Sequence, residues 1–565
     1  MLHGYKVPSK PYEYQKDVPI RIIEGTLEGK NLHVLIAPAG AGKTYAVVKT
    51  FVEGYKDYIR PRMFHVLPTR SLAYRFYKEY IEGYFGGEVR EGVNRQRVKG
   101  GLIISLERGH VSGSKFMMAT DVVISTRDTF LYSLVGMRVR DGYVDVPFGN
   151  IAGSLVVLDE VQMLQDEYAY GPRIMRSAVK ALVEAGATVL IITATLPSRY
   201  LKMLSDFEPT VYVVGTENPY EYSDVILYSE DVGRIAKRRV SEDKYRVSVT
   251  QPVSGVEEML NMVGEKLSER ISDGKTLIVM NTVNNAIEVY KRIREKYSDA
   301  VLIHSRFVVE DREMRERMLD EARVIVATQV VEAGLDVKDI KYVLTELAPI
   351  DALIQRIGRA GRSPEVGSCE ALVVPIISVL KEKKEKREVV LPYYYISDHK
   401  RLLEIVEKNL EEFPKALSDA SVSTRLVDEG FELVEENIST DVLKKLGASV
   451  IALENLSINA IPDDFAVRPR EYVEIVPKEK IEEKLGKLKE GLELEKNVVE
   501  RMKLTLDKEL ARGLYAEYVL ESKENKRVLR KYKIGVERAY RIGRIPVVSG
   551  YTEFGFVKSS SKKRR

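Results

Sequence analysis

Three arginines recur at every third position in the stretch "DALIQRIGRAGR", which covers residues 351–362. Arg356, Arg359 and Arg362 are separated by glycines, and no carboxylate lies between them. Like charges at this spacing repel one another on a helix, and glycine weakens the helix itself. A sequence that accepts both costs is expected to hold its arginines ready for an anion.

The stretch "APAGAGKT" has the residue types and spacing of a phosphate-binding loop, and it consists of Ala37, Pro38, Ala39, Gly40, Ala41, Gly42, Lys43 and Thr44. Ala37 takes the position that is usually glycine, while the two glycines let backbone N–H groups turn inward around phosphate oxygens. The helical pattern that follows adds its N-terminal dipole. Lys43 is expected to reach the β- and γ-phosphates and Thr44 to bind Mg²⁺, so the predicted ligands are ATP and Mg²⁺.

Two adjacent carboxylates end the apolar run in "SLVVLDEVQ" (residues 154–162). A buried strand that ends in this way places them at the edge of a parallel sheet where α/β proteins bind ligands. Asp159 is predicted to hold Mg²⁺, and Glu160 is predicted to be the general base that polarises the attacking water. The alternative for the pair alone is an acidic loop after a strand, but the phosphate-binding loop upstream favours the catalytic interpretation.

Ten short runs rich in β-branched residues alternate with helical patterns: "LHVLIAP", "RMFHVLP", "DVVIST", "SLVVLDE", "TVLIITAT", "KTLIVMNT", "AVLIHS", "ARVIVATQV", "KYVLTEL" and "ALVVPI". Continuous Val, Ile and Leu runs between helices are typical of parallel strands buried on both faces. The sequence therefore predicts an α/β protein with two tandem parallel-sheet domains, residues 1–215 and residues 216–380. A hinge is expected at about 205–225.

The second predicted domain has no phosphate-binding loop of its own, but it carries the arginine stretch after its strands. Two such domains can close over one ATP, the first supplying the loop and the metal ligands and the second supplying cations to the γ-phosphate. An arginine in this role stabilises transition-state charge and contributes about 10³–10⁵ in rate. A basic surface turn is the alternative, and the regular Gln-Arg-x-Gly-Arg-x-Gly-Arg spacing argues against it.

The character of the sequence changes in residues 381–565, where we expect a linker and a mostly helical C-terminal accessory domain. The run "KEKKEKRE" (residues 381–388) is interpreted as a solvated linker or helix face. Long charged helical patterns are expected over residues 478–532. The basic tail "KSSSKKRR" is expected to be a disordered, solubilising end.

The composition narrows the classes of function. The chain has 565 residues, with 88 Lys and Arg against 84 Asp and Glu, so its net charge of +4 permits a local basic channel but not a uniformly basic surface. Cys369 is the only cysteine and the six histidines are scattered, which argues against disulfides and against a metallonuclease centre. With no apolar run able to span a bilayer and no signal-peptide core, a cytoplasmic protein without a membrane partner is expected. Scarce Gln with plentiful Lys, Glu, Arg, Val and Ile is typical of a thermophile.

Seven segments in this order resemble the motifs of superfamily 2 helicases: "APAGAGKT", "PTRSLA", "STRD", "LDEVQ", "TATLP", "ATQVVEAGLDV" and "QRIGRAGR". The resemblance covers about the first 375 residues and is strongest to the CRISPR-associated helicase of type I systems. "NTVNNA" (residues 281–286), "LIHSRF" (residues 302–307) and Glu332 favour that branch over RNA-remodelling DEAD-box proteins. It implies two RecA-like domains, ATP and Mg²⁺ as cofactors, and single-stranded DNA as a partner.

The resemblance also implies roles for the residues that match its motifs. The residues that would contact the nucleic-acid strand are Pro68, Thr69, Arg70, Thr126, Asp128, Asn281, Thr328 and Gln329. The residues that would meet ATP outside the loop are Gln15, which matches an adenine-reading glutamine, Asp336 and Arg356. The residues that would couple the ATP state to the strand are Gln162, Thr193, Thr195 and Gln355. Arg359 and Arg362 match the arginines that meet the γ-phosphate, and they join Glu160 as predicted catalytic residues. For any single threonine, a helix cap is the alternative role.

The sequence departs from the family pattern in two ways. Gln162 takes a position where histidine is commoner, so a different polar partner is expected to couple ATP to the strand. No His–Asp cluster of an HD nuclease is present, which resembles systems whose nuclease is a separate subunit. The resemblance therefore implies two further partners, a separate HD nuclease subunit and a CRISPR guide-RNA surveillance complex.

Our interpretation from sequence is an ATP-dependent single-stranded DNA translocase that unwinds target DNA, 3′ to 5′ by resemblance, in type I CRISPR interference. The first alternative is a helicase of DNA repair or RNA remodelling. The second is a nucleotide-switched nucleic-acid-binding module that does not move processively. An intact Glu160 and two γ-phosphate arginines argue against the second, because a switch does not need fast hydrolysis.

Overall fold

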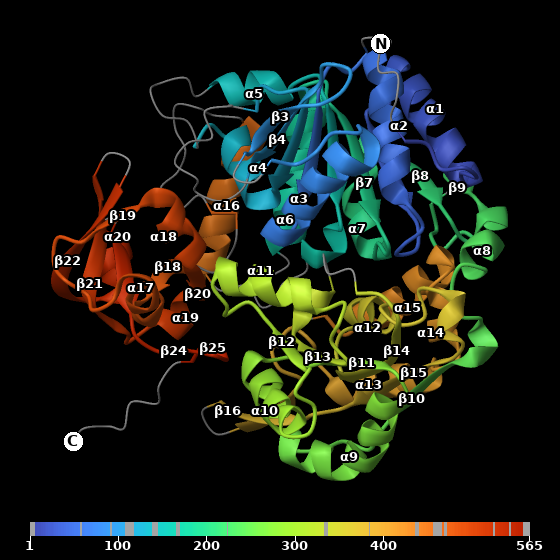
Figure 1. The fold of residues 1–565 in the computed structure, drawn as a ribbon. Helices are drawn as coiled ribbons and strands as arrows, with labels where there is room; N and C mark the ends of the chain where they lie inside the picture. Colours follow the sequence, from blue (N-terminus) through green and yellow to red (C-terminus); the bar gives the residue numbers. More distant parts are fainter. Residues whose placement is uncertain are drawn as a thin grey trace. The chain divides into compact units, whose positions relative to one another are not determined.

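A computed structural model of the chain describes residues 6–56, 59–90, 93–107, 118–137, 145–164, 170–222, 224–332, 337–382, 385–434, 440–455, 466–467, 472–523, 526–541 and 544–557 (Figure 1). Contacts within the chain divide it into two units. Unit 1 consists of Met1–Gly255 and Glu332–Pro469, and unit 2 consists of Val256–Val331 and Arg470–Arg565. Both units are α/β, and all ten runs expected to be strands are strands.

Unit 1 contains a nine-stranded sheet in the order β3-β4-β5-β2-β6-β7-β1-β8-β9. Its strands are β1 (Leu32–Ile36), β2 (Met63–Leu67), β3 (Arg95–Arg97), β4 (Ile103–Glu107), β5 (Val122–Thr126), β6 (Leu155–Asp159), β7 (Thr188–Thr193), β8 (Thr210–Val213) and β9 (Val225–Leu227). All neighbours are parallel except β3 and β4, which are antiparallel. Every residue of β1, β2, β5, β6 and β7 is buried, which explains their uninterrupted apolar sequences.

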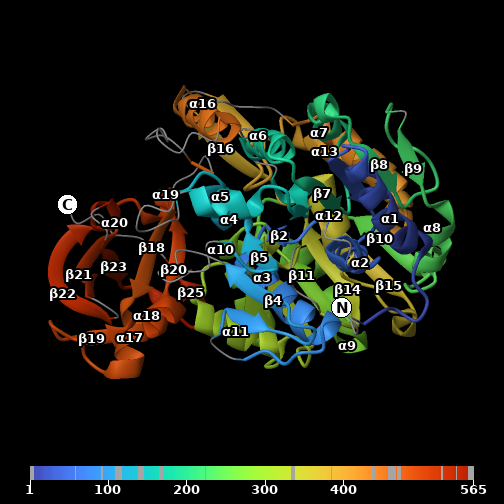
Figure 2. The same ribbon diagram turned by 90° about the horizontal axis from the view of Figure 1, so that it is seen from above.

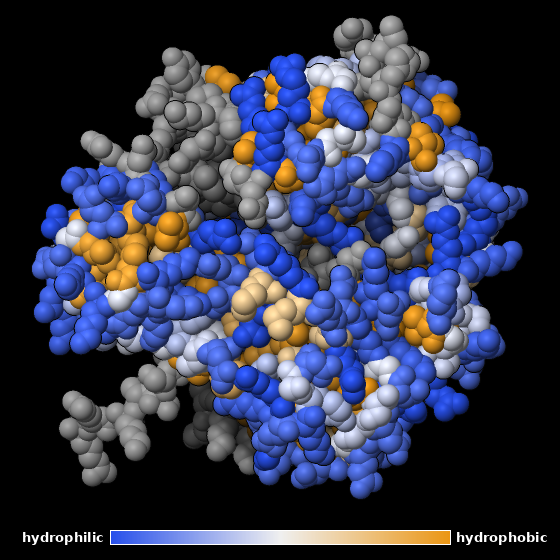
Figure 3. Space-filling model, viewed as in Figure 1, coloured by the Kyte–Doolittle hydropathy of each residue, from blue (hydrophilic) through white to orange (hydrophobic). Residues whose placement is uncertain are grey.

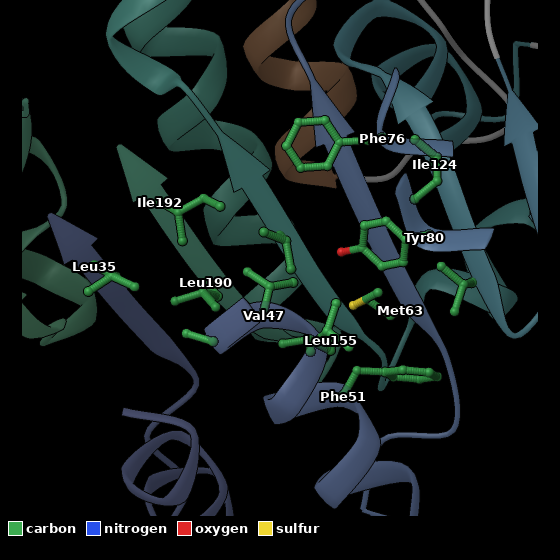
Figure 4. Close-up of a cluster of buried hydrophobic side chains, with 14 of the residues drawn as sticks. Leu35, Val47, Phe51, Met63, Phe76, Tyr80, Ile124, Leu155, Leu190 and Ile192 are labelled. Carbon is green, nitrogen blue, oxygen red and sulfur yellow. The ribbon is translucent and has the colours of Figure 1, made fainter. Parts of the chain in front are cut away.

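Helices cover this sheet and connect its strands: α1 (Glu13–Leu27), α2 (Lys43–Lys56), α3 (Arg70–Lys78), the π-helix η1 (Glu79–Tyr84), α4 (Arg127–Leu134), α5 (Asp145–Ile151), the 3-10 helix η2 (Val161–Leu164), α6 (Tyr170–Glu184), α7 (Ser198–Met203), η3 (Ser205–Phe207), α8 (Ser229–Ala236) and η4 (Glu242–Lys244). Figure 4 shows Val47 and Phe51 of α2 in a cluster of buried side chains with Leu155 of β6 and Leu190 of β7. Because α2 shares this buried cluster with the sheet, the loop before it is held at the sheet's edge.

The rest of unit 1 contains three parallel strands and further helices. The strands are β10 (Tyr245–Val249), β15 (Cys369–Val374) and β14 (Ile340–Glu346), in that order. The helices are α12 (Ile350–Ile357), η6 (Pro364–Val366), α13 (His399–Lys408), α14 (Glu412–Ala416), α15 (Ala420–Phe431) and α16 (Thr440–Asn455). Helix α16 lies beside α6 (Figures 1 and 2), and Asp428 of α15 accepts hydrogen bonds from the backbone N–H and the hydroxyl of Ser198.

Unit 2 contains two sheets. The first has parallel strands β11 (Lys275–Val279), β13 (Val324–Ala327) and β12 (Val301–Ile303), with α9 (Val256–Asp273), α10 (Val283–Arg294), α11 (Val309–Met318) and η5 (Gln329–Val331). The second has the order β19-β22-β21-β23-β18-β20. Its strands are β18 (Tyr472–Pro477), β19 (Glu493–Glu495), β20 (Leu504–Asp507), β21 (Tyr515–Lys523), β22 (Lys526–Gly535) and β23 (Ile545–Val548), with helices α17 (Lys478–Leu485), α18 (Lys496–Met502), α19 (Lys508–Ala511) and α20 (Val536–Arg541).

A short hairpin, β24 (Tyr551–Thr552) and β25 (Gly555–Phe556), follows this second sheet and lies against the segment after β12. The N–H of Phe556 donates to the carbonyl of Arg306 at 2.9 Å, and the hydroxyl of Tyr551 donates to Asp311 Oδ2 at 2.6 Å. Most of the surface in Figure 3 is hydrophilic, with an apolar patch over the C-terminal strands and helices of this unit.

Three local expectations from the sequence are wrong. Residues 205–225 are not simply a hinge, because β8 lies there and extends the first sheet. The run at 381–388 is part of an antiparallel hairpin, β16 (Ser378–Glu382) with β17 (Glu385–Val389), rather than a linker. Residues 478–532 alternate short helices with strands. In β21 buried positions are interspersed with exposed ones, so cross-strand packing overrides the helix propensity of its Lys, Glu and Leu residues.

The start of α1 depends on a distant carboxylate. The N-cap residue of α1, Tyr12, makes no side-chain capping bond. Asp231 instead accepts from the backbone N–H groups of Glu13 and Tyr14, each at 2.9 Å. Asp231 is 1% exposed and Tyr14 is buried, so loss of the carboxylate leaves the Tyr14 N–H without a partner in a buried position.

We therefore expect Asp231→Ala to lower the free energy of unfolding by about 1.5–3 kcal/mol, the value of a hydrogen bond to a charged group. Denaturant unfolding followed by circular dichroism measures this. Asp206→Ala is the matched control, because the Arg176–Asp206 pair is at the surface with Asp206 70% exposed, and it is expected to cost less than about 1 kcal/mol. Equal losses in the two variants would contradict the capping role.

Candidate active site

The loop at Ala37–Thr44 lies between β1 and α2, at the C-terminal edge of the nine-stranded sheet. Gly40 and Gly42 have φ angles of 80° and 84°, a conformation that side chains other than glycine rarely adopt. Lys43 is buried, and its ammonium group donates to the carbonyl oxygens of Ala37 at 2.9 Å and Pro38 at 3.3 Å. The loop therefore holds a fixed positive charge at its centre, as phosphate binding requires.

Gln15 connects α1 to this loop. Its Nε2 donates to the carbonyls of Ala41 at 3.3 Å and Gly42 at 2.9 Å, and its Oε1 accepts from the N–H of Tyr12 at 2.9 Å. A Cβ at Gly42 would lie 2.6 Å from Gln15 Nε2, so glycine is needed there for this contact as well as for its φ angle. The adenine-reading role of Gln15 stays a prediction.

The two carboxylates lie side by side at the end of β6 but have different surroundings. Asp159 Oδ2 accepts from His65 Nε2 at 3.0 Å. Glu160 has a φ angle of 53°, a left-handed conformation that is uncommon for residues other than glycine, and the charge of the loop lysine acts on its carboxyl. Burial raises the pKa of Glu160, Asp159 adds to this rise, and the cations of Lys43 and Arg359 oppose it. A carboxylate with a raised pKa is suited to accept a proton from water.

Gln162 links Glu160 to the next strand. Its Nε2 donates to Glu160 Oε2, and its Oε1 accepts from the hydroxyl of Thr193 at the end of β7. The N–H of Thr195 in turn donates to Thr193 Oγ1 at 3.3 Å. Three of the four predicted coupling residues therefore form one connected chain that ends on Glu160, while the fourth, Gln355, lies on α12.

The three arginines of the opening stretch have different environments. Arg356 is completely buried, and its guanidinium donates to Glu332 Oε1 at 2.7 Å, to Tyr393 Oη at 2.7 Å and to Thr345 Oγ1 at 3.1 Å. These acceptors face it from three directions, as a structural ion pair requires. An ATP contact by Arg356 stays a prediction that this burial disfavours.

Arg359 and Arg362 lie in the segment that follows α12. Arg359 donates to the carbonyl of Glu332, and its charge lowers the pKa of Glu160. Gly361 has a φ angle of 63°, and a Cβ there would lie 3.1 Å from Cys369 Sγ, so the turn that carries Arg362 needs glycine. Burial and the charge of Arg362 lower the pKa of Arg239 to about 10. This added cation, whose guanidinium donates to the Gly358 and Ala360 carbonyls, has no signal in the sequence.

The predicted strand-contacting residues gather at two sheet edges, one in each unit. In unit 1, Pro68, Thr69 and Arg70 follow β2, and Thr126 and Asp128 follow or end β5; the two strands are parallel neighbours with Leu67 opposite Thr126. Thr69 also caps α3, accepting from the N–H of Leu72 at 3.2 Å. In unit 2, Asn281 follows β11 and Thr328 and Gln329 follow its parallel neighbour β13.

A hydrogen bond joins the unit 2 set, from Gln329 Nε2 to the carbonyl of Asn281 at 2.7 Å. Asp336 lies outside the described residues, so its approach to ATP stays a prediction. The described residues contain no group of three or more His, Cys, Asp or Glu side chains that could hold a metal ion. Thr44 and Asp159 supply two oxygen donors, which is the partial ligand set that Mg²⁺ takes when nucleotide phosphates and water complete its shell. None of the described helices is long and apolar enough to cross a membrane.

Two families of known proteins match parts of this chain. The DEAD/DEAH box helicase family matches residues 16–204, and the C-terminal part of the CRISPR-associated nuclease/helicase Cas3 family matches residues 272–365. The first match contains the loop, the carboxylates and the unit 1 strand contacts. The second contains Asn281, Thr328, Gln329 and the arginines.

Whole-chain comparisons agree with these matches. The CRISPR-associated helicase Cas3 of Thermoproteus tenax is 28% identical over 463 residues, covering 78% of this chain and 71% of the relative. A Cas3 nuclease/helicase of Methanocaldococcus jannaschii is 25% identical over 495 residues, covering 83% of this chain but 61% of that protein. The crystal structure of T. fusca Cas3 has a TM-score of 0.60 at 18% identity, over 90% of this chain and 66% of that one. This likeness confirms the expected fold class, with tandem RecA-like domains and a further C-terminal region.

The different environments of the arginines predict different consequences of losing them. Arg356→Ala is expected to lower the free energy of unfolding by about 3–5 kcal/mol, because Glu332 is left buried without its partner. Arg362→Ala is expected to leave folding nearly unchanged and to slow ATP hydrolysis by about 10³-fold or more. Denaturant unfolding and steady-state hydrolysis on the same samples separate the two effects. A folded but inactive Arg356→Ala together with an unfolded Arg362→Ala would reverse the assignment.

Proposed function

We propose that this chain, a superfamily 2 helicase with a DEAD/DEAH-box domain and a Cas3-like C-terminal domain, hydrolyses ATP to move 3′ to 5′ along single-stranded DNA. In this proposal it acts in the cytoplasm and unwinds target DNA in type I CRISPR interference. One observation carries the proposal: Glu160 follows β6, which only β7 separates from β1, the strand that leads into the loop, and it is hydrogen-bonded through Gln162 to Thr193 at the end of β7. The loop, the proposed general base and the arginine stretch all belong to unit 1, and we propose that they form one site.

The hydrolytic step follows from these positions. Lys43 binds the β- and γ-phosphates, and Arg359 and Arg362 stabilise the charge that develops on the γ-phosphoryl group. Glu160 orients a water molecule and takes its proton as the water oxygen bonds to the γ-phosphorus and the bond to the β-phosphate oxygen breaks. Mg²⁺, held by Thr44 and Asp159, would neutralise charge on the phosphates.

Gln162, which links Glu160 to Thr193, offers a route from ATP hydrolysis to the nucleic-acid strand. When the γ-phosphate leaves, the hydrogen-bonding demands on Glu160 change, and Gln162 passes that change to Thr193 and Thr195. In this chain an amide thus takes the place in which the family more often has an imidazole. An amide ends in an NH₂ group that donates and a carbonyl oxygen that accepts, which is what a bridge between a carboxylate and a hydroxyl needs.

The strand contacts favour movement over sequence recognition. The proposed set consists mainly of Thr, Asn, Gln and Arg at strand ends, residue types that bind sugar and phosphate. A motor that crosses any sequence needs such contacts, because base-specific hydrogen bonds would stop it at preferred sites. We propose DNA rather than RNA as the substrate because the Thermoproteus tenax and Methanocaldococcus jannaschii relatives, which are more similar to this chain than the matched DEAD-box RNA helicases, are named CRISPR-associated Cas3 proteins.

The nuclease step is proposed to come from a partner. Relatives of this chain include proteins named nuclease/helicase, whereas the residues described here contain no cluster of metal-ligating side chains. We propose a separate HD nuclease subunit and a guide-RNA surveillance complex that exposes the strand. Copurification of an HD-domain protein with the tagged chain from its native cells tests the first of these partners.

Replacing the general base separates binding from turnover. Glu160→Gln removes the proton acceptor but keeps the side chain's size, so hydrolysis is expected to fall by about 10²–10⁴-fold while ATP binding stays within a few-fold. Strand displacement of 3′-tailed DNA should be lost with it. Glu208→Gln is the matched control, because Glu208 also has a positive φ angle, 47°, and is expected to behave as the wild type.

The same assay with 5′-tailed DNA and with RNA substrates distinguishes the alternatives. Displacement of 3′-tailed DNA alone supports the proposal. Equal displacement of RNA duplexes would support an RNA-remodelling helicase. ATP binding and hydrolysis with no displacement of any substrate would support a nucleotide-switched binding module and contradict the motor.

A further inference from the structure

A buried chain of hydrogen bonds runs behind the active-site carboxylates, through side chains that the mechanism above does not use. His65 of β2 lies between two partners, with Nε2 at 3.0 Å from Asp159 Oδ2 and Nδ1 at 2.8 Å from the hydroxyl of Tyr80. His65 and Tyr80 are fully buried, and Asp159 is 8% exposed. Water therefore cannot replace either bond.

The two bonds fix the direction of this chain. A carboxylate only accepts hydrogen bonds, so His65 donates through Nε2–H to Asp159. In the neutral imidazole, Nδ1 is then the acceptor, and the Tyr80 hydroxyl donates to it. The imidazole ring packs edge-on against Phe76, with centroids 4.8 Å apart, and against Tyr80 at 5.8 Å. Figure 4 shows the Tyr80 hydroxyl pointing into the buried cluster.

The hydrogen-bonded pair His65 and Tyr80 also brackets one segment of the sequence. Residues 65–80 begin on β2 and end in the π-helix η1, which continues α3. Between these ends lie Pro68, Thr69 and Arg70, the proposed strand contacts. His65, at one end of this segment, is hydrogen-bonded directly to Asp159, the carboxylate proposed to hold the metal. Tyr80, at the other end, is connected to Asp159 through the imidazole ring of His65. π-helical turns are rare and often occur at functional sites, and here the turn carries Tyr80.

We propose that His65 is a positioning residue for Asp159, and that the His65–Tyr80 pair couples metal–nucleotide binding at Asp159 to strand binding at residues 68–70. This inference rests on the proposed function. Partners of this kind hold a ligating carboxylate in its binding orientation, and their loss typically costs about 10–100-fold in metal affinity or activity. The pair differs from the Gln162 bridge because it acts on Asp159 rather than on Glu160.

A second His–Tyr pair in the same sheet provides an internal comparison. His33 Nδ1 lies 3.2 Å from the hydroxyl of Tyr212, and His33 Nε2 lies 3.1 Å from the carbonyl of Lys30. Both rings are buried, as in the first pair. Its second partner is a backbone carbonyl instead of a carboxylate, so Tyr212→Phe removes a similar hydroxyl without affecting Asp159.

The test measures Mn²⁺ binding by electron paramagnetic resonance, with a non-hydrolysable ATP analogue, with and without a thymidine oligonucleotide. His65→Leu removes both bonds and is expected to weaken Mn²⁺ binding by about tenfold or more. His65→Gln keeps an N–H that can reach Asp159, but its amide has no atom at the position of the imidazole Nδ1 that accepts from Tyr80. It is expected to bind Mn²⁺ nearly as the wild type does without the oligonucleotide.

Tyr80→Phe and His65→Gln are both expected to lose the effect of the oligonucleotide on Mn²⁺ affinity, so that the ratio of affinities with and without it falls toward one. Tyr212→Phe is expected to keep the wild-type ratio. ATP hydrolysis is measured on the same variants. In Tyr80→Phe, the stimulation of hydrolysis by DNA is expected to fall more than the basal rate of hydrolysis.

Two results would overturn the inference. One is a wild-type Mn²⁺ affinity that does not respond to the oligonucleotide, and the other is wild-type binding and ratio in His65→Leu and Tyr80→Phe. If His65→Leu does not fold, Tyr80→Phe decides the coupling, because it removes a single oxygen. If the wild type hydrolyses ATP and unwinds DNA while the variants keep the wild-type Mn²⁺ affinity and ratio, only this inference is contradicted. A wild type that does neither contradicts the proposed function itself.

Discussion

The carboxylates at the end of β6 have to remain charged where little water reaches them, and much of unit 1 is arranged around that requirement. Burial favours the protonated form of Glu160, and the cations of Lys43 and Arg359 oppose it. Asp159 instead has a hydrogen-bond donor, His65, on one of its oxygens. The same positive charges that would meet phosphate therefore also keep the general base ready to accept a proton.

This electrostatic balance explains why the loop is fastened on several sides. The ammonium group of Lys43 is held by two loop carbonyls, and Gln15 and Tyr14 hold the Ala41 carbonyl from α1. Helix α1 is itself held at its start by Asp231 from α8. A displacement of any of these parts would move the lysine relative to Glu160, and the pKa of the base would change with it.

The sequence was sufficient for the parts that depend on local pattern. Continuous apolar runs predicted every strand that carries a proposed site residue, because such strands are buried on both faces. The order of motifs indicated which strand ends would carry the loop, the carboxylates and the arginines. Chain order says nothing about which buried side chains meet, so Arg239, Tyr80 and the role of His65 could not be predicted. Their partners lie on other elements and at no regular spacing.

The C-terminal part shows the opposite situation. Its Lys-, Glu- and Leu-rich residues have high helix propensity, and the sequence therefore favoured long helices. The structure instead has a six-stranded sheet with short helices, because strands such as β21 and β22 bury some of their apolar residues against partners that are up to dozens of residues away. Cross-strand pairing of this kind is decided by the whole sheet, and single-sequence propensity does not report it.

The buried pair of Arg356 and Glu332 has a consequence for how this chain can diverge. Arg356 is completely buried and Glu332 is nearly so, and a mutation at one position therefore leaves a poorly compensated charge until the other changes as well. Tyr393 and Thr345, which also accept from Arg356, add to this mutual dependence. Among homologues, substitutions at positions 332, 345, 356 and 393 should therefore occur together. Position 362 should be substituted only in homologues that no longer hydrolyse ATP. Within one short arginine repeat, folding would then constrain the residue at position 356 and catalysis would constrain the residue at position 362.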